Sequence, residues 1–315
     1  MMFMILKLMM LNLLTFFFLI LMIMVGVAYL TLLERKLLGY IQYRKGPNIS
    51  SFAGLMQPFS DALKLMTKEF NILLKTNYIF FYYSPFMMLV MMMLLWLIFP
   101  FMTGSLFFNY DLLYIFCCLS LNSYFIIISG WASNSSYSML GAIRCVAQLI
   151  SYEISFFLIL FNLILIIFSM NFYKFIFYQS GWCFFFTHFF LFVFYLVSVL
   201  AELNRTPFDL IEGESELVSG FNVEYFGMSF AMIFLAEYGN IMFMSLMTSV
   251  LFFGISIFSF FFFFFFMLFN FFIIWIRGVL PRMRFDELMF MCWKILLPLS
   301  LFFLMTTFML KYVYL

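Results

Sequence analysis

Residues 1–30, MMFMILKLMMLNLLTFFFLILMIMVGVAYL, form a nearly uninterrupted apolar run in which Lys7 is the one charged side chain. About 20 apolar residues in a helix are enough to cross the hydrocarbon core of a bilayer. The run is longer than the apolar core of a signal peptide, and no small-residue cleavage site follows a short apolar core. We therefore predict that this stretch is retained as a first transmembrane helix.

The rest of the chain has the same apolar character. Hydrophobic residues make up 67% of the 315 residues, charged residues make up 10%, and the mean hydropathy is +1.14. This composition excludes a soluble globular domain. We predict an all-α polytopic membrane protein, a single integral membrane domain over residues 1–315. Apolar runs and turn residues predict about eight spans, at 5–33, 78–102, 112–131, 139–168, 182–201, 225–250, 252–276 and 288–313.

The predicted connections differ in charge on the two sides of the membrane. Long loops at 34–77, 202–224 and 277–287 fall on one side together with the short connection at 132–138, and this side holds eleven Lys and Arg residues. The opposite side, with both termini and a tight turn near residue 251, holds Lys7, Lys174 and Lys311. The positive-inside rule therefore places the long loops in the cytoplasm or matrix and both termini outside. Eleven of the fourteen acids also fall on the long-loop side, where we expect function to be concentrated.

The first long loop contains SFAGLMQPFSDALKLMTKEF at 51–70, which predicts an amphipathic helix lying along the membrane interface. Pro58 would start a new turn, with Ser60 as a candidate cap. The apolar positions that recur at helical spacing are Leu55, Phe59, Leu63 and Met66.

The segment AELNRTPFDLIEGESELVSGFNVEY at 201–225 gathers six acids around a single arginine, Arg205. In a low-dielectric setting such carboxylates repel one another, so some must share protons or find cations. The cluster indicates proton or cation handling, or a polar ligand at the membrane edge. The alternative is a solvated loop kept acidic for solubility. The six acids are Glu202, Asp209, Glu212, Glu214, Glu216 and Glu224.

Four ionisable residues fall inside predicted spans: Arg144, Glu153, Glu237 and Lys294. Each costs roughly 2.5–3.5 kcal/mol at the bilayer centre on insertion scales. Arg144 and Glu153 lie about 13 Å apart along one helix, too far to pair directly. Lys294 lies near a loop and can extend to the surface. We predict that Glu153 and Glu237 belong to a polar path rather than to purely structural hydrogen bonds.

Cysteine and histidine usage indicates that this chain binds no metal or other cofactor of its own. The single histidine, His188, suits packing or an interhelical hydrogen bond, and one histidine cannot build a haem or redox-metal site. The cysteines show no CxxC pair, so we expect buried small hydrophobes rather than ligands or disulfides. They are Cys117, Cys118, Cys145, Cys183 and Cys292.

Five segments spread in order along the chain closely resemble the subunit 1 family of mitochondrial NADH–ubiquinone oxidoreductase, respiratory complex I. The segments are LLERKLLGYIQYRKGPN (32–48), GWASNSSYSMLGAIRCVAQLISYE (130–153), the acidic segment (201–225), FLAEYGNI (234–241) and WIRGVLPRMRFDELM (275–289). The content of 54 Phe and 28 Met is typical of an insect or other A+T-rich mitochondrial genome.

The resemblance implies a core membrane subunit of the H⁺-translocating NADH:ubiquinone reductase (EC 7.1.1.2), located in the mitochondrial inner membrane with both termini in the intermembrane space. Such a subunit anchors the peripheral arm, forms much of the ubiquinone tunnel and begins the path that links quinone reduction to proton pumping. It implies no catalytic residue in this chain alone. No dinucleotide, flavin or cluster motif is present, so FMN and iron–sulfur clusters are expected on partner subunits and ubiquinone is expected as the substrate. The implied partners are quinone-site subunits of the peripheral arm, neighbouring membrane subunits and membrane lipid, with cardiolipin as one candidate, but no nucleic acid.

The resemblance also implies roles for two sets of residues. The quinone-tunnel and junction set is Arg35, Arg44, Asp61, Phe221, Glu224, Arg277, Arg282 and Arg284. The proton-coupling set is Glu34, Glu153, Glu202, Asp209, Glu212, Glu214, Glu216, Glu237 and Tyr238. We expect quinone reduction to change the field at the acidic segment, and the change to propagate through Glu237 and Glu153, because neighbouring carboxylates titrate as a coupled set.

Two other functions fit the composition. A secondary transporter would use the intramembrane charges to bind a substrate and a coupling ion, but it would usually show internal repeats and paired broken helices, which are not evident here. A passive membrane scaffold would use the charged face only for docking. Neutralising Glu153 or Glu237 would then leave activity intact.

Overall fold

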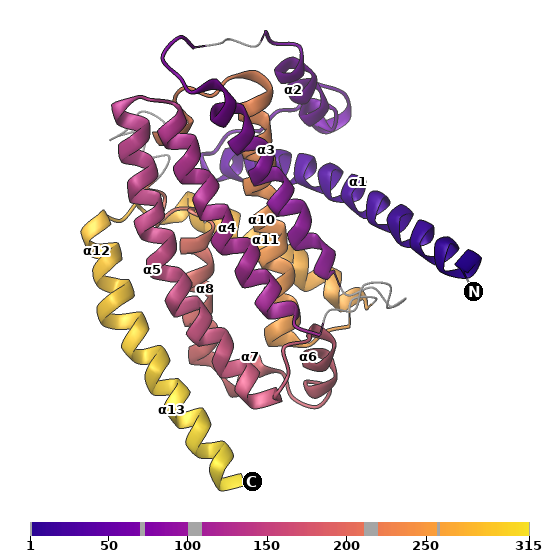
Figure 1. Ribbon diagram of the computed structural model, residues 1–315, viewed down its shortest axis with the longest axis vertical. Helices are drawn as coiled ribbons and strands as arrows, with labels where there is room; N and C mark the ends of the chain where they lie inside the picture. The colour runs from indigo at the N-terminus through magenta and orange to yellow at the C-terminus, as the bar shows by residue number, and fades with distance from the viewer. Residues whose placement is uncertain (1, 70–72, 100–108, 211–219, 257–258, 315) are drawn as a thin grey trace.

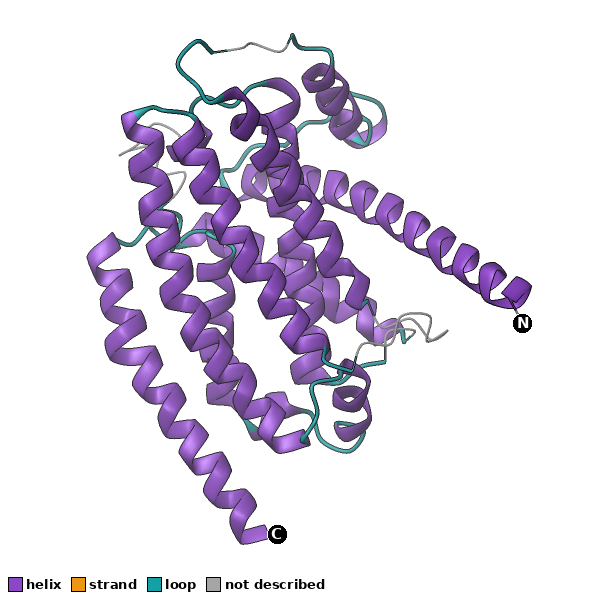
Figure 2. Cartoon of the chain, viewed as in Figure 1, coloured by secondary structure: helices purple, strands orange, loops and turns teal. Residues whose placement is uncertain are grey.

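The computed structural model describes residues 2–69, 73–99, 109–210, 220–256 and 259–314. Within these ranges all regular secondary structure is helical (Figure 2), which confirms the predicted fold class.

Among the described residues, seven helices are long and apolar enough to cross a bilayer. They are α1 (Met2–Ile41), α3 (Tyr78–Leu95), α4 (Asp111–Ala132), α5 (Ser136–Ile167), α10 (Gly227–Phe253), α11 (Phe260–Val279) and a last span formed by α12 (Phe285–Phe290), a π-helical turn (Met291–Leu296) and α13 (Leu297–Tyr314). An eighth apolar helix, α8 (Phe189–Glu202), is shorter. The remaining helices are α2 (Gln57–Met66), α6 (Phe172–Tyr178) and α7 (Phe184–Thr187), with 3₁₀ turns at Phe52–Gly54, Trp96–Ile98 and Gly220–Asn222.

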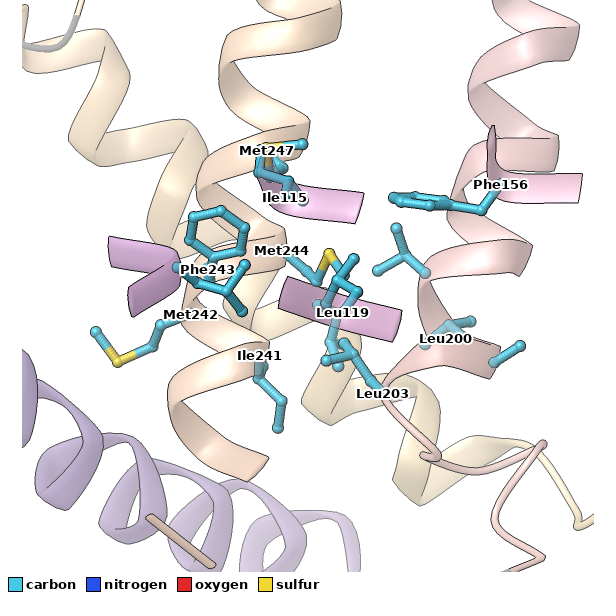
Figure 3. Packing of buried hydrophobic residues seen from close by; sticks show 14 of the residues in the cluster. Ile115, Leu119, Phe156, Leu200, Leu203, Ile241, Met242, Phe243, Met244 and Met247 are labelled. Atoms are coloured by element: carbon cyan, nitrogen blue, oxygen red, sulfur yellow. The ribbon is translucent and has the colours of Figure 1, made fainter. Parts of the chain in front are cut away.

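The spans form a bundle around α10. Helices α3, α4, α5, α8 and α10 run along one another, whereas the N-terminal part of α1 projects away from the bundle and α13 lies along its opposite edge (Figure 1). Every residue of α10 from Ile241 to Phe252 is buried, as expected for a helix that is apolar on all sides. Figure 3 shows its side chains packing with residues of α4, α5 and α8, among them Leu119, Phe156 and Leu200.

Hydroxyl side chains in the buried part of α10 are satisfied within the helix itself. Ser245, Thr248 and Ser249 each donate to the backbone carbonyl three residues earlier, at 2.7 Å. Large apolar side chains on α11 and α13 are instead exposed, including Phe260, Phe261 and Phe302. Exposed apolar faces of this kind suit contact with lipid.

Two predicted helix boundaries need correction: the end of the first span and the turn between α10 and α11. Helix α1 continues to Ile41, beyond the predicted end near residue 33, because Leu33 and Leu37 pack against the core and carry the helix through the charged residues. Glu34 and Arg35 are therefore helical residues rather than loop residues. The predicted tight turn near 251 is also wrong. Helix α10 ends at Phe253, where Gly254 adopts φ 57° and terminates the helix, and α11 begins at Phe260.

Three smaller predictions are also corrected. The span predicted at 182–201 is interrupted at His188, which separates α7 from α8. Helix α2 is present, but Ser60 does not cap it; the N-cap position is Met56, Pro58 lies in the first turn, and the Ser60 hydroxyl donates to the Gln57 carbonyl. Cys117 is exposed and Cys183 is half-buried, whereas both were expected to be buried.

Candidate functional site

A buried carboxylate on α1 joins three parts of the chain. The Glu34 side chain, only 3% exposed as a residue, accepts a hydrogen bond from Arg205 Nη1 at 3.4 Å and forms an ion pair with Arg277 of α11. The Arg205 guanidinium also lies 4.7 Å from the centre of the Tyr238 ring on α10. An unpaired charge here would be costly, so one carboxylate held between two guanidinium groups ties α1, α10 and α11 to the segment after α8.

Arg205 keeps its positive charge in this environment. Burial alone would lower the pKa of its guanidinium, but Glu34, Tyr238 and Glu237 outweigh that effect and hold the pKa above its ordinary value. Arginine therefore supplies a fixed charge beside Tyr238 at any physiological pH.

The chain after α8 is held in place from two directions. From α5, the amide of Gln148 donates to the carbonyls of Ala201 and Phe208, both at 2.9 Å. From the connection after α11, the Met283 amide donates to the Pro207 carbonyl at 2.9 Å, next to a cis Thr206–Pro207 peptide bond. These contacts position Arg205 without using its side chain.

The same two segments are joined by an ion pair between Asp209 and Arg282, at 3.2 Å. Both residues were predicted for the site, and the structure brings them together. Gln148 was missed by the sequence analysis. Its side chain is neutral, so nothing in the 130–153 motif singled it out, and only the structure shows that its amide is fully buried.

A small cavity of about 40 Å³ lies between α3, α4 and α10 and the end of α8. Glu202 and Glu237 both line it, together with Phe221. Several buried polar atoms around it have no hydrogen-bond partner among the described residues: Asn122 Oδ1, Glu202 Oε2, Asn204 Oδ1, Arg205 Nη2 and Asn240 Oδ1. The volume is far below the roughly 300–1,000 Å³ of ligand pockets, but it is enough for about two or three water molecules.

A larger cavity of about 270 Å³ lies between α1, α2 and α10. Most of its lining is apolar, including Val27, Leu65 and Phe234. Its polar elements are Thr31, the Arg35–Asp61 ion pair, at 2.5 Å, and Tyr238. Tyr238 lines this cavity whereas the preceding residue, Glu237, lines the small one. Consecutive residues of one helix therefore face two cavities.

Glu153 lies half-buried on α5 and lines neither cavity. It is nevertheless close enough to Glu202 for their charges to interact. Its Oε1 atom is buried and has no hydrogen-bond partner among the described residues. Both acids are thus placed where a change in one charge would be felt by the other.

Other predicted residues are not part of this cluster. Arg44 is exposed and donates to Gln42 at 2.9 Å, and Arg284 is exposed at the start of α12. Glu224 is half-buried before α10. The predicted coupling residues Glu212, Glu214 and Glu216 lie outside the described residues.

Comparison with known proteins decides the family. The model of the family described as "NADH dehydrogenase" matches residues 14–308, which is nearly the whole chain. The chain belongs to the NADH dehydrogenase family. This confirms the resemblance carried by the five sequence motifs.

Similar proteins within this family are named "NADH-ubiquinone oxidoreductase chain 1". The protein from Anopheles gambiae is 52% identical over 286 residues, covering 91% of each chain. The protein from Locusta migratoria is 51% identical over 291 residues, covering 92% of this chain and 93% of its own. The protein from Apis mellifera ligustica is 44% identical over 293 residues, covering 93% and 95%. These insect relatives agree with the origin suggested by the Phe- and Met-rich composition.

Proposed function

We propose that this chain is a core membrane subunit of the H⁺-translocating NADH:ubiquinone oxidoreductase of the mitochondrial inner membrane. Its support is the family match, the name shared by relatives that are 44–52% identical, and seven apolar helices long enough to span a bilayer. In this proposal the chain works with peripheral-arm subunits and with neighbouring membrane subunits. The flavin and iron–sulfur clusters are expected on partner subunits. Both termini of this chain face the intermembrane space.

The 270 Å³ cavity is proposed as part of the path of ubiquinone. An isoprenoid tail needs an apolar corridor, and a quinone headgroup needs a few polar donors at its end. The cavity offers apolar walls from α1, α2 and α10, with Thr31, Tyr238 and the Arg35–Asp61 pair as its polar elements. The observation that carries the proposal is that Tyr238 connects this cavity to the buried Glu34–Arg205–Arg277 cluster.

Coupling would follow from the charge change at the quinone. Reduction of a quinone to a quinol takes up two electrons, which partner subunits would deliver, and two protons. A charge that appears or disappears near Tyr238 acts on Arg205 and Glu34 through a buried, weakly screened environment. Glu237 and Glu202 would respond by changing their share of protons, since interacting carboxyls titrate together.

Waters in the 40 Å³ cavity would carry the proton between Glu202 and Glu237. The unpaired amide oxygens of Asn122 and Asn240 on its wall are suited to hold such waters, since buried polar atoms normally have a protein or water partner. Glu153, which interacts with Glu202, would be the next group on the path. Glu212, Glu214 and Glu216 remain proposed as the acidic loop at the quinone cavity, and Arg44 and Arg284 as junction residues.

Photo-crosslinking with a ubiquinone analogue in native membranes tests the quinone path. We expect labelling, competed by excess ubiquinone, on peptides from α2 (57–66) and from the first turns of α10 (228–238), because both line the 270 Å³ cavity. A matched control is the peptide of α13, which does not contribute to that cavity. Competed labelling found only on other subunits would overturn the assignment of the path to this chain.

A further inference from the structure

The side chain of Gln148 on α5 connects two points of one short segment, residues 201–208, which runs from the last turn of α8 into the following loop. Its amide nitrogen donates to the Ala201 carbonyl and to the Phe208 carbonyl, each at 2.9 Å. An amide group carries both of its N–H donors on the nitrogen, so two carbonyl acceptors fix the direction in which the amide points. Gln148 is 0% exposed. One buried group therefore fastens both ends of the segment to α5.

These two hydrogen bonds are not required to satisfy the carbonyls that accept them. The Ala201 carbonyl also accepts from the Asn204 amide at 3.2 Å, and the Phe208 carbonyl also accepts from the Leu210 amide at 3.0 Å. Removal of the Gln148 amide would therefore leave neither carbonyl without a donor, which is the costly outcome for a buried polar group. It would instead remove the attachment of the segment to α5. This arrangement indicates a positional role for Gln148.

The attached segment carries polar residues of the 40 Å³ cavity. Glu202, Asn204 and Arg205 all line that cavity. Asn204 adopts φ 50°, a left-handed conformation that asparagine tolerates better than most residues. Glu202 directly follows Ala201, so a shift of the Ala201 carbonyl would move Glu202 relative to Glu237, which lines the same cavity from α10. The attachment to α5 thus bears on the geometry between the two acids.

A second residue on the same side of α5 supports one end of the segment. Tyr152 lies four residues after Gln148, so both side chains share a face of the helix. The Tyr152 ring lies 5.8 Å from the Phe208 ring, and its hydroxyl donates to the Leu288 carbonyl of α12 at 3.4 Å. Tyr152 contacts the Phe208 end, whereas Gln148 bonds both ends. Gln148 is therefore the residue whose loss would free the segment at Ala201.

We propose that Gln148 is a positioning residue for proton coupling, which holds Glu202 and Arg205 in register with Glu237 and Tyr238. Gln148 lines neither the 40 Å³ cavity nor the 270 Å³ cavity, so it acts through the segment and does not contact the quinone or the proton. The inference rests on the proposed function, because it assigns Gln148 a part in the coupling at that site. The segment does not line the 270 Å³ cavity, so the KM for ubiquinone should not change.

The test measures protons pumped per NADH oxidised, and the KM for ubiquinone, in complexes reconstituted in sealed vesicles. Gln148→Met keeps the length of the side chain and removes both donors. The matched control Asn162→Leu removes another fully buried amide of α5, which donates to the Ser300 carbonyl at 3.3 Å and accepts from Thr307 at 3.0 Å, both on α13. We expect Gln148→Met to pump roughly half as many protons per NADH or fewer, since small misplacements of reacting groups are costly, with an unchanged KM. Asn162→Leu should pump normally. Equal losses in the two variants would overturn the proposal.

Hydrogen exchange in the intact complexes tests the attachment itself. We expect Gln148→Met to lose protection of the backbone amides within 201–210, and Asn162→Leu to keep it there. Unchanged protection in Gln148→Met would contradict the proposal. Gln148→Asn keeps the amide but shortens its reach by one methylene group, and it should give an intermediate proton ratio. It replaces Gln148→Met in every measurement if that complex does not assemble.

Glu237→Gln separates failure of this inference from failure of the proposed function. If Glu237→Gln lowers the proton ratio while Gln148→Met and Gln148→Asn keep it normal, the coupling stands and Gln148 is not a positioning residue for it. If all three variants keep a normal ratio, the proposed coupling fails together with this inference.

Discussion

At the scale of single residues, burial decides which ion pairs matter. Glu34 pairs with two arginines and Asp61 with one, and the Glu34 side chain is 4% exposed whereas the Asp61 side chain is 33% exposed. Removing one partner of a buried pair leaves an uncompensated charge, whereas an exposed pair contributes little because water and salt screen it. The two carboxylates therefore form a natural comparison.

We predict that Glu34→Gln destabilises the chain by roughly 3–5 kcal/mol, since it leaves the buried Arg205 and the partly exposed Arg277 without their shared carboxylate. Asp61→Asn should cost about 1 kcal/mol or less. Both losses of stability are measured by thermal denaturation of the detergent-solubilised complex, with the dissociation of this chain as the signal. Equal losses from the two variants would show that the buried cluster is not a structural tie.

The importance of Glu34 could be predicted only in part. The LLERK motif identified it by resemblance, yet its pairing with Arg205 and Arg277 spans 171 and 243 positions in sequence. Gln148, which the sequence analysis missed, shows the same limit. A neutral amide inside an apolar span has no pattern that indicates which carbonyls it will bind.

At the scale of helices, close backbone approach positions the wall of the small cavity. A Cβ atom added to Gly141 of α5 would lie 3.0 Å from Gly220 Cα and 3.1 Å from the Phe221 amide nitrogen. These are backbone atoms of the Gly220–Asn222 turn, so the turn itself would have to move. Phe221, which lines the small cavity, would move with it.

We predict that Gly141→Ala lowers stability by roughly 1–3 kcal/mol, as overpacking does. It should also reduce NADH:ubiquinone activity through displacement of Phe221. The control is Gly181→Ala, because no atom lies within 4 Å of the added Cβ there. Melting temperature and activity of the two complexes are the measurements. Indistinguishable values would mean that the turn adapts without cost.

Helix α2 forms one wall of the 270 Å³ cavity, so filling the cavity from α2 should obstruct ubiquinone. We predict that Ala62→Phe, at a lining position, raises the KM for a long-tailed ubiquinone roughly tenfold through lost contact and access. Ser60→Phe places the same ring at an exposed position that does not line the cavity and should leave the KM close to its original value. Steady-state kinetics with the two variants would contradict the quinone path if both KM values stayed unchanged.

Helices were predictable because lipid and water impose simple patterns. Apolar length predicted the long spans, and the spacing of Leu55, Phe59, Leu63 and Met66 predicted α2. Helix ends were less predictable, as Ile41 and Phe253 show, because packing carries a helix past charged or small residues. The interruption at His188 has no composition signal within the Phe-rich run around it.

At the scale of the whole molecule, helix α10 lies between two cavities whose linings differ. Tyr238 faces the apolar cavity between α1 and α2, and Glu237 faces the small polar cavity beside Glu202. The sequence indicated a polar path through both residues. It could not indicate which cavity each faces, because a helix that is apolar on all sides lacks the periodicity that orients it.

The proposed coupling requires that Glu237 transfers the effect of quinone reduction to the proton path. The most direct measurement is the number of protons pumped per NADH oxidised by complexes reconstituted in sealed vesicles, carrying Glu237→Gln or the control Asp286→Asn, an exposed acid on α12. The account predicts normal pumping in the control and a strongly reduced ratio of protons to electrons in Glu237→Gln. A normal ratio in Glu237→Gln would contradict it.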